Sequence, residues 1–322
     1  MENLQIVWRK EKDGTAIIYR ISGLTGYVEI PEQINGITIS KIADYCFSGN
    51  AMVPDDAEHI YINMDDNKEH YIREICGEYL EGISLPDTVT SLGSFAFYNC
   101  RNLKWIEVGC ALKEIGCDVF MNCTCLHNVY MRCSAKDSTG LQHLLARISW
   151  DVNVTFEIAG KREALIVYPE YFETYDEIAP AHIFGRNIEG EGFRARQCFD
   201  GGVLNAEHYD RIFAKACVEE NKTVLYRMAA ARLVYPFNLT AEHRNEYECL
   251  IKENDIDAAR WMVSLKSIKA FEEMQKHDIL SIEALGAAIS QAAAEGWSEG
   301  AAYLMKLRHS NNLRKKKSRY EF

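Results

Sequence analysis

Cysteine is the most reactive residue type in this 322-residue chain, which contains eleven of them. Five lie within 24 residues, with His127 among them: Cys110, Cys117, Cys123, Cys125 and Cys133. Thiolates and an imidazole could hold zinc, but such a site needs four ligands that converge tetrahedrally. The pair Cys123 and Cys125 lacks the Cys-x-x-Cys spacing of zinc knuckles. We therefore expect reduced thiols that fill a core, and we predict no metal site.

Three arginines in a glycine-containing stretch are weaker candidates for chemistry. Arg186, Arg194 and Arg196 could recognise a phosphate or carboxylate, because a guanidinium binds such groups through two parallel hydrogen bonds. The alternative is that they pair with nearby acids at a junction between domains. An enzyme site at this junction is the second functional hypothesis. However, no phosphate-binding loop, zinc-protease or nucleophile-elbow motif occurs, so we predict no catalytic residue and no cofactor.

The elements that would position these residues show a 23-residue period in the first half of the chain. The apolar pair Ile83 and Leu85 recurs as Ile106 and Val108, and again as Val129 and Met131. The same spacing reaches Ile60 and Ile62 in one direction and Val152 and Val154 in the other, with a looser match at Val28 and Ile30. Each pair has the alternation of a half-buried strand. Because so short a strand cannot bury its face alone, about six stacked rungs are expected to form a β-solenoid.

In such a stack, the residues beside each apolar position point outward and form two ladders. One predicted ladder comprises Glu29, Tyr61, Ser84, Glu107, Tyr130 and Asn153. The other comprises Tyr27, His59, Gly82, Trp105, Asn128 and Asp151. Exposed aromatic side chains are effective anchors for protein partners. The partner-binding candidates are therefore Glu29, His59, Tyr61, Trp105, Glu107 and Tyr130. The alternative is that these aromatics pack against the following domain or merely line a strand surface.

The stretch 85–103, LPDTVTSLGSFAFYNCRNL, resembles the repeat of BspA-type leucine-rich repeat proteins. Residues 30–47 resemble a longer opening repeat of that family, and the similarity extends over about residues 14–158. The resemblance implies a β-solenoid or horseshoe that binds proteins or host surfaces. The leading hypothesis is accordingly a non-enzymatic scaffold that binds a protein partner, and the third is a surface adhesin.

The second half of the chain has helical periodicity instead. Apolar stripes and stop signals predict helices at 205–219, 222–234, 241–253, 255–264, 267–276, 281–294 and 297–308. The fold class is thus α+β, a leucine-rich-repeat solenoid followed by helical hairpins. The expected divisions are 1–158 for the repeat domain, 159–204 for a junction, 205–310 for the helical domain and 311–322 for a basic tail.

Charge and hydropathy restrict the partners and the location. The net charge is −11, and residues 1–158 carry 13 Lys and Arg against 22 Asp and Glu, a net of −9. This acidity argues against nucleic acid and favours a basic protein partner. The chain shows no signal peptide and no apolar run long enough to span a bilayer, so we expect a cytoplasmic protein without membrane insertion, with a surface or secreted location as the alternative.

Overall fold

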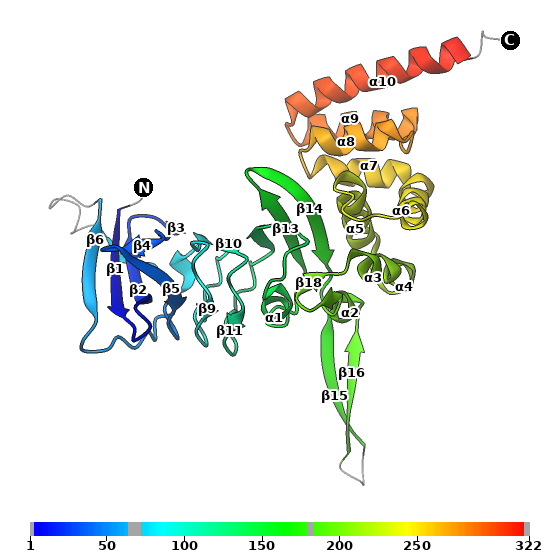
Figure 1. The fold of residues 1–322 in the computed structure, drawn as a ribbon. Coiled ribbons are helices and arrows are strands. Elements are labelled where there is room, and N and C mark those ends of the chain that lie inside the picture. The colour runs from blue at the N-terminus through cyan, green and yellow to red at the C-terminus, as the bar shows by residue number, and fades with distance from the viewer. Residues whose placement is uncertain (1–2, 64–71, 179–182, 319–322) are drawn as a thin grey trace. The chain divides into compact units, whose positions relative to one another are not determined.

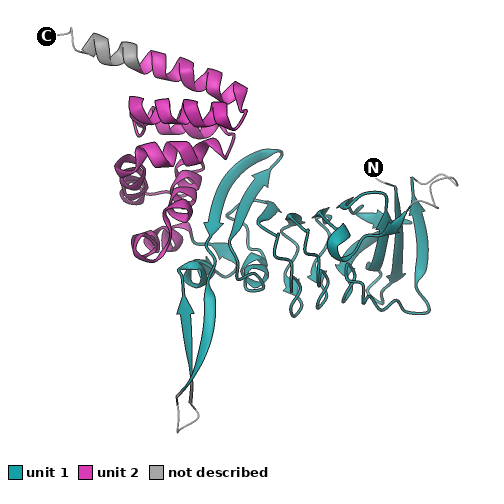
Figure 2. Cartoon of the chain, turned by 180° about the vertical axis from the view of Figure 1, so that it is seen from behind, with its two compact units in different colours: residues 1–205 teal, residues 206–322 magenta. Residues whose placement is uncertain are grey.

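A computed structural model describes residues 3–63, 72–178 and 183–318. The chain divides into two compact units, Met1–Asn205 and Ala206–Phe322 (Figure 2). The first is built mainly of β-strands and the second of α-helices (Figure 1). The predicted fold class, a β-solenoid followed by an α-helical region, is confirmed. The exact domain boundaries expected from the sequence stay predictions.

The repeat strands form the parallel part of a six-stranded sheet. Its strands β3 (Tyr27–Glu29), β8 (Gly82–Ser84), β10 (Trp105–Gly109), β12 (Asn128–Arg132) and β13 (Val152–Ile158) lie in this order. Val28, Ile83, Ile106, Val129 and Val154 are in register across it and are all buried. Strand β14 (Lys161–Tyr168) pairs antiparallel with β13 and ends the sheet.

The register of the last parallel strand differs from the predicted one. Tyr130 lies opposite Thr155 and Asn128 opposite Asn153, so the last step is two residues longer than the repeat period. The longer step follows from helix α1 (Leu141–Leu145), which is inserted between β12 and β13. The ladders therefore end at Thr155 and Asn153 instead of the predicted Asn153 and Asp151.

A second correction concerns Ile60 and Ile62, which were predicted to form a rung of the solenoid. Strand β6 (Glu58–Ile62) is not a rung between β3 and β8, because these two strands pair directly with each other. It pairs antiparallel with β1 (Leu4–Lys10), a strand that lies outside the repeat pattern.

A third correction concerns the cysteines that were expected to fill a core. All eleven cysteines are free thiols, but Cys110, Cys117 and Cys125 are exposed and do not fill a core. Cys217 and Cys249 are exposed as well.

Strand β1 belongs to an eight-stranded sheet that also closes the other side of the solenoid. Its order is β11 (Glu114–Ile115), β9 (Ser91–Leu92), β5 (Ile37–Ile42), β2 (Ala16–Gly23), β1 and β6. The short strands β4 (Gln33–Ile34) and β7 (Arg73–Glu74) join it beside β5 and β2.

The solenoid core is filled by residues that recur between its two sheets. The rings of Phe47, Phe97 and Phe120 stack, with centroids 4.9 and 5.5 Å apart. The thiols of Cys100 and Cys123 are buried and donate to main-chain carbonyls of the preceding turn. These two cysteines thus fill the core as expected. Burial also raises the pKa of the Cys133 thiol to about 12, so this thiol is protonated at neutral pH.

The rest of the first unit carries a separate hairpin. Strands β15 (Phe172–Ile178) and β16 (Ile183–Glu189) form their own two-stranded sheet, and helix α2 (Gly192–Ala195) follows. A second small hairpin consists of β17 (Phe199–Asp200) and β18 (Val203–Leu204).

The second unit contains helices at the predicted places, except that the single helix predicted at 205–219 is divided into two. They are α3 (Ala206–Arg211), α4 (Phe213–Glu219), α5 (Lys222–Val234), α6 (Ala241–Glu253), α7 (Asp255–Val263), α8 (Ile268–Lys276), α9 (Ile282–Ala294) and α10 (Ser298–Ser318). Asn221, Thr240, Ser267 and Ser281 each cap a helix by accepting an N–H bond from the third residue beyond. Helix α10 continues into the segment expected as a basic tail. None of the described helices is both long and apolar enough to cross a membrane.

Candidate partner-binding surface

Three aromatic rings gather on the outward side of the parallel sheet. The ring of Trp105 stacks on Tyr27 at 6.5 Å between centroids and meets Tyr130 edge-on at 6.3 Å. Gly82 makes this possible, because a Cβ there would lie 2.3 Å from the Trp105 ring. Tyr27 is 42% exposed, and the other two rings are half-buried. We call Tyr27, Trp105 and Tyr130 the aromatic cluster.

The aromatic cluster is held at its edge by an acidic side chain. The Tyr27 hydroxyl and the Lys104 ammonium both donate to Glu81 Oε2, at 2.9 and 2.6 Å. Both bonds lower the pKa of Glu81, and the bond from Lys104 contributes more than the bond from Tyr27. The carboxylate therefore stays charged and fixes the orientation of Tyr27.

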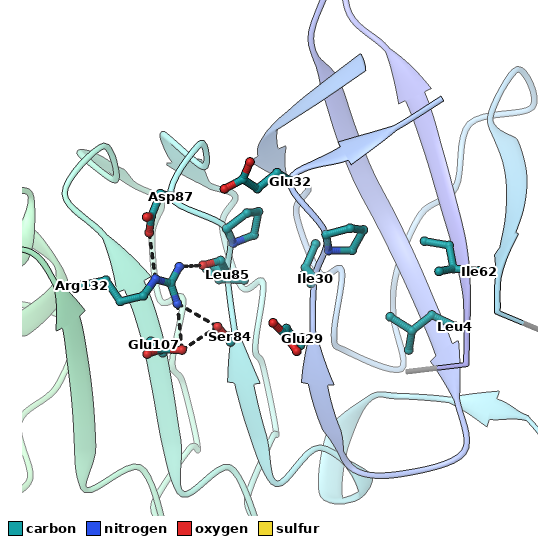
Figure 3. A pocket seen from close by; sticks show the side chains of 12 residues that line it. Leu4, Glu29, Ile30, Glu32, Ile62, Ser84, Leu85, Asp87, Glu107 and Arg132 are labelled. Atoms are coloured by element: carbon teal, nitrogen blue, oxygen red, sulfur yellow. Dashed lines mark hydrogen bonds and ion pairs between the residues drawn. The ribbon is translucent and has the colours of Figure 1, made fainter. Parts of the chain in front are cut away.

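A pocket of about 430 Å³ opens near the other ends of the same strands (Figure 3). Its charged and polar lining consists of Glu29, Glu32, Ser84, Asp87, Glu107 and Arg132. Its apolar lining consists of Leu4, Ile30, Pro31, Ile62, Leu85 and Pro86. Among the described lining residues, four carboxylates face one guanidinium, so the lining is acidic. We call this cavity the acidic pocket.

Arg132 crosses from β12 to β8, two strands away. Its guanidinium donates to Asp87 Oδ1, Glu107 Oε2 and Ser84 Oγ at 2.8 Å each, and also to the Leu85 carbonyl. Ser84 donates in turn to Glu107 at 2.6 Å. Gly109 lies opposite Arg132 on the intervening strand, and a Cβ there would come within 2.6 Å of Asp87. The missing side chain thus leaves room for the Arg132–Asp87 contact.

The sheet brings together four of the six residues expected to bind a partner. Trp105 and Tyr130 belong to the aromatic cluster, and Glu29 and Glu107 line the acidic pocket. In register, Glu107 lies beside both Ser84 and Tyr130, so the cluster and the pocket form one continuous face. Sequence reasoning missed Arg132 and Asp87 as parts of this face. The sequence contains one sign of this contact, Gly109. In the repeat register Gly109 lies opposite Arg132, and its lack of a side chain leaves space for the long side chain of Arg132.

The other two candidates, His59 and Tyr61, do not lie on the ladder. They are on β6 in the eight-stranded sheet, where Gln5 Nε2 donates to the Tyr61 hydroxyl at 3.0 Å and lies 3.4 Å from His59 Nδ1. Their neighbour Ile62 lines the acidic pocket, and alternation along the strand directs Tyr61 to the opposite face. The placement of these two residues in the ladder was wrong. Their 23-residue spacing from strand β8 suggested a rung of the solenoid, but β6 pairs antiparallel with β1 instead.

The three arginines considered for anion binding each have partners in the structure. Arg186 pairs with Glu173 and lowers the pKa of that carboxyl through its hydrogen bonds. Arg194 pairs with Glu191 at 2.5 Å. Arg196 is only 1% exposed, and its guanidinium donates to four main-chain carbonyls. This geometry gives Arg196 a structural role, and anion binding at the three positions stays a prediction.

The clustered cysteines are not part of a metal-ligand group in the part of the chain that the structure describes. Among the described residues no group of three or more His, Cys, Asp and Glu side chains is placed to hold a metal ion. The five clustered cysteines are split between buried positions, Cys123 and Cys133, and exposed ones, Cys110, Cys117 and Cys125.

A comparison with models of protein families agrees with the predicted repeat. A family model described as "BspA type Leucine rich repeat region (6 copies)" matches residues 74–139. A crystal structure of a T. pallidum leucine rich repeat protein is similar at 23% identity and a TM-score of 0.29, over 38% of this chain and 49% of that one. A leucine rich cell surface protein from Faecalibacterium prausnitzii A2-165 is similar at 25% identity and a TM-score of 0.28, over 39% of this chain and 31% of that one.

The chain therefore spans less than half the length of either structure, and no curated protein matches it. Leucine-rich repeat proteins of this type are generally modules for protein interaction or adhesion and are typically non-enzymatic. The strands β8, β10 and β12, which carry much of the candidate face, lie inside the matched residues. Residues 74–139 of this chain are a BspA-type leucine-rich repeat region.

Proposed function

We propose that the protein is a non-enzymatic interaction module that binds a protein partner through the outward face of β3, β8, β10 and β12. The observation that carries the proposal is the continuity of the aromatic cluster with the acidic pocket on one parallel sheet. Aromatic side chains supply a large contact area at a small entropic cost, which makes them frequent hot spots.

The charge of the face supports a basic partner. Glu29 and Glu107 lie on this face, and residues 1–158, which carry it, hold a net charge of −9. Opposite charges across an interface accelerate association and exclude acidic competitors. The free thiols, five of them exposed, support action in a reducing compartment such as the cytoplasm.

Replacing Trp105 and Tyr130 by Ala tests the proposal. Hot-spot truncations weaken binding by about 2 kcal/mol or more, so we expect at least about a thirtyfold loss of affinity for the partner. The measurement is quantitative capture of partners from native cells by the wild type and by each variant, followed by titration of the captured protein. Thermal unfolding of both variants is measured in parallel by circular dichroism.

The matched control is Tyr175→Ala, which removes an exposed tyrosine from the separate β15–β16 hairpin. We expect this control to retain all partners. The proposal fails if Trp105→Ala and Tyr130→Ala retain the partners, or if they lose them only together with the melting transition of the first unit.

A further inference from the structure

We propose that the acidic pocket receives an arginine side chain from an extended segment of the protein partner. This inference deepens the proposed function and rests on it. It names the group that enters the cavity beside the aromatic cluster and the residues that hold that group.

The first argument is charge. The pocket has four carboxylates, and Arg132 already engages two of them, Asp87 and Glu107. Its donors also reach Ser84 and the Leu85 carbonyl, so the guanidinium is committed to the wall of the cavity. Glu29 and Glu32 lie on the other side, and both line the cavity. A second cation that enters between the two sides meets Glu29 and Glu32, and carboxylates outnumber cations among the described lining residues.

The second argument is the apolar wall. Ile30-Pro31 and Leu85-Pro86 occupy equivalent positions in neighbouring turns, joined by the bond from the Ile30 amide to the Ser84 carbonyl. Leu4 and Ile62, paired between β1 and β6, extend this wall. An arginine buries its methylene stem along such a surface and keeps its charged end beside carboxylates. Its planar fork also matches carboxylates better than a lysine ammonium does.

The third argument is size. A volume of about 430 Å³ falls within the range of ligand pockets, which is about 300–1,000 Å³. It exceeds what a bare metal ion fills, and the carboxylates of the pocket are not among any metal-binding group found in the described residues. An organic cation on a flexible stem fits the cavity and its charge together.

The test is a titration of the isotope-labelled full chain with acetyl-glycyl-arginyl-glycinamide, followed by the amide signals of Ser84, Gly109 and Arg132 in NMR spectra. The comparison peptides carry lysine or citrulline, the neutral relative of arginine. We expect saturable shifts with the arginine peptide at a Kd of about 0.1–10 mM, the affinity that one side chain can supply. The lysine peptide binds more weakly, and the citrulline peptide produces no saturable shift.

The variant Glu29→Gln/Glu32→Gln is expected to weaken arginine binding about tenfold or more. The control Glu78→Gln/Glu283→Gln removes the same formal charge at exposed positions outside the pocket and should bind as the wild type does. The inference is overturned by an absence of saturable shifts, by equal binding of the citrulline or lysine peptide, or by unchanged binding to the pocket variant. Those results leave the proposed function intact, because loss of the partner on Trp105→Ala is measured independently.

Discussion

Replacement of Arg196 by Met is expected to destabilise the first unit by about 4 kcal/mol or more. The buried guanidinium donates to the carbonyls of Trp150, Pro169 and Ile148 at 2.7, 2.6 and 2.8 Å, and to Gly192 at 2.9 Å. A buried carbonyl without a partner costs about 1–3 kcal/mol, and those of Ile148, Trp150 and Pro169 lose this donor together, while the Gly192 carbonyl keeps the Arg196 main-chain amide. The bonds also join three segments that are separate in sequence: the end of the α1 region, the end of β14 and the start of α2. Their loss therefore releases the end of the solenoid.

The measurement is chemical denaturation followed by tryptophan fluorescence, with circular dichroism recording the helical unit separately. Arg147→Met is the matched control, because Arg147 is exposed and directly precedes Ile148, whose carbonyl accepts from Arg196. We expect this surface change to cost about 1 kcal/mol or less. Arg196→Lys should fall between the two, since an ammonium cannot span four carbonyls. A loss of less than about 1 kcal/mol in Arg196→Met would refute the structural role.

The sequence predicted the repeated elements well because repetition multiplies a weak signal. One apolar pair proves little, but the recurrence of Ile83, Ile106 and Val129 at one spacing requires that they stack. Helix boundaries were equally accessible, since caps such as Asn221 and Ser281 accept bonds from their own helices and need no distant partner. These signals are local or periodic, so a single sequence reveals them.

The features that escaped prediction depend on pairing between distant segments. Strand β1 precedes the repeat and pairs with β6, which removes His59 and Tyr61 from the ladder. The acidic pocket depends on Arg132 reaching Asp87 past Gly109, a contact across 45 positions of the sequence. Arg196 was considered as an anion-binding residue or as the partner of a nearby acid, although the structure gives it main-chain carbonyls as partners, which no side-chain motif reveals. Each of these contacts could be predicted only if the register of the sheet or the path of the chain were already known.

A buried ion pair in the second unit yields the other large effect. Arg232 of α5 and Asp210 of α3 are both fully buried, and the guanidinium donates to both carboxylate oxygens at 2.7 and 2.8 Å. The hydroxyl of Tyr247 donates to Asp210 at 2.8 Å, and burial raises the pKa of this tyrosine well above its usual range. Three helices thus converge on one carboxylate that is shielded from solvent.

Replacement of Asp210 by Ala is expected to lower the free energy of unfolding of the helical unit by about 3–5 kcal/mol, because Arg232 keeps its charge in an apolar surrounding. Glu207→Ala is the control on the same helix, since Glu207 pairs with Arg211 at the surface and its loss should cost about 1 kcal/mol or less. The double variant Asp210→Leu/Arg232→Met removes both charges and should recover much of the loss. Denaturant titration followed by far-ultraviolet circular dichroism measures all three. If Asp210→Ala unfolds at the same denaturant concentration as Glu207→Ala, the pair does not hold the three helices together.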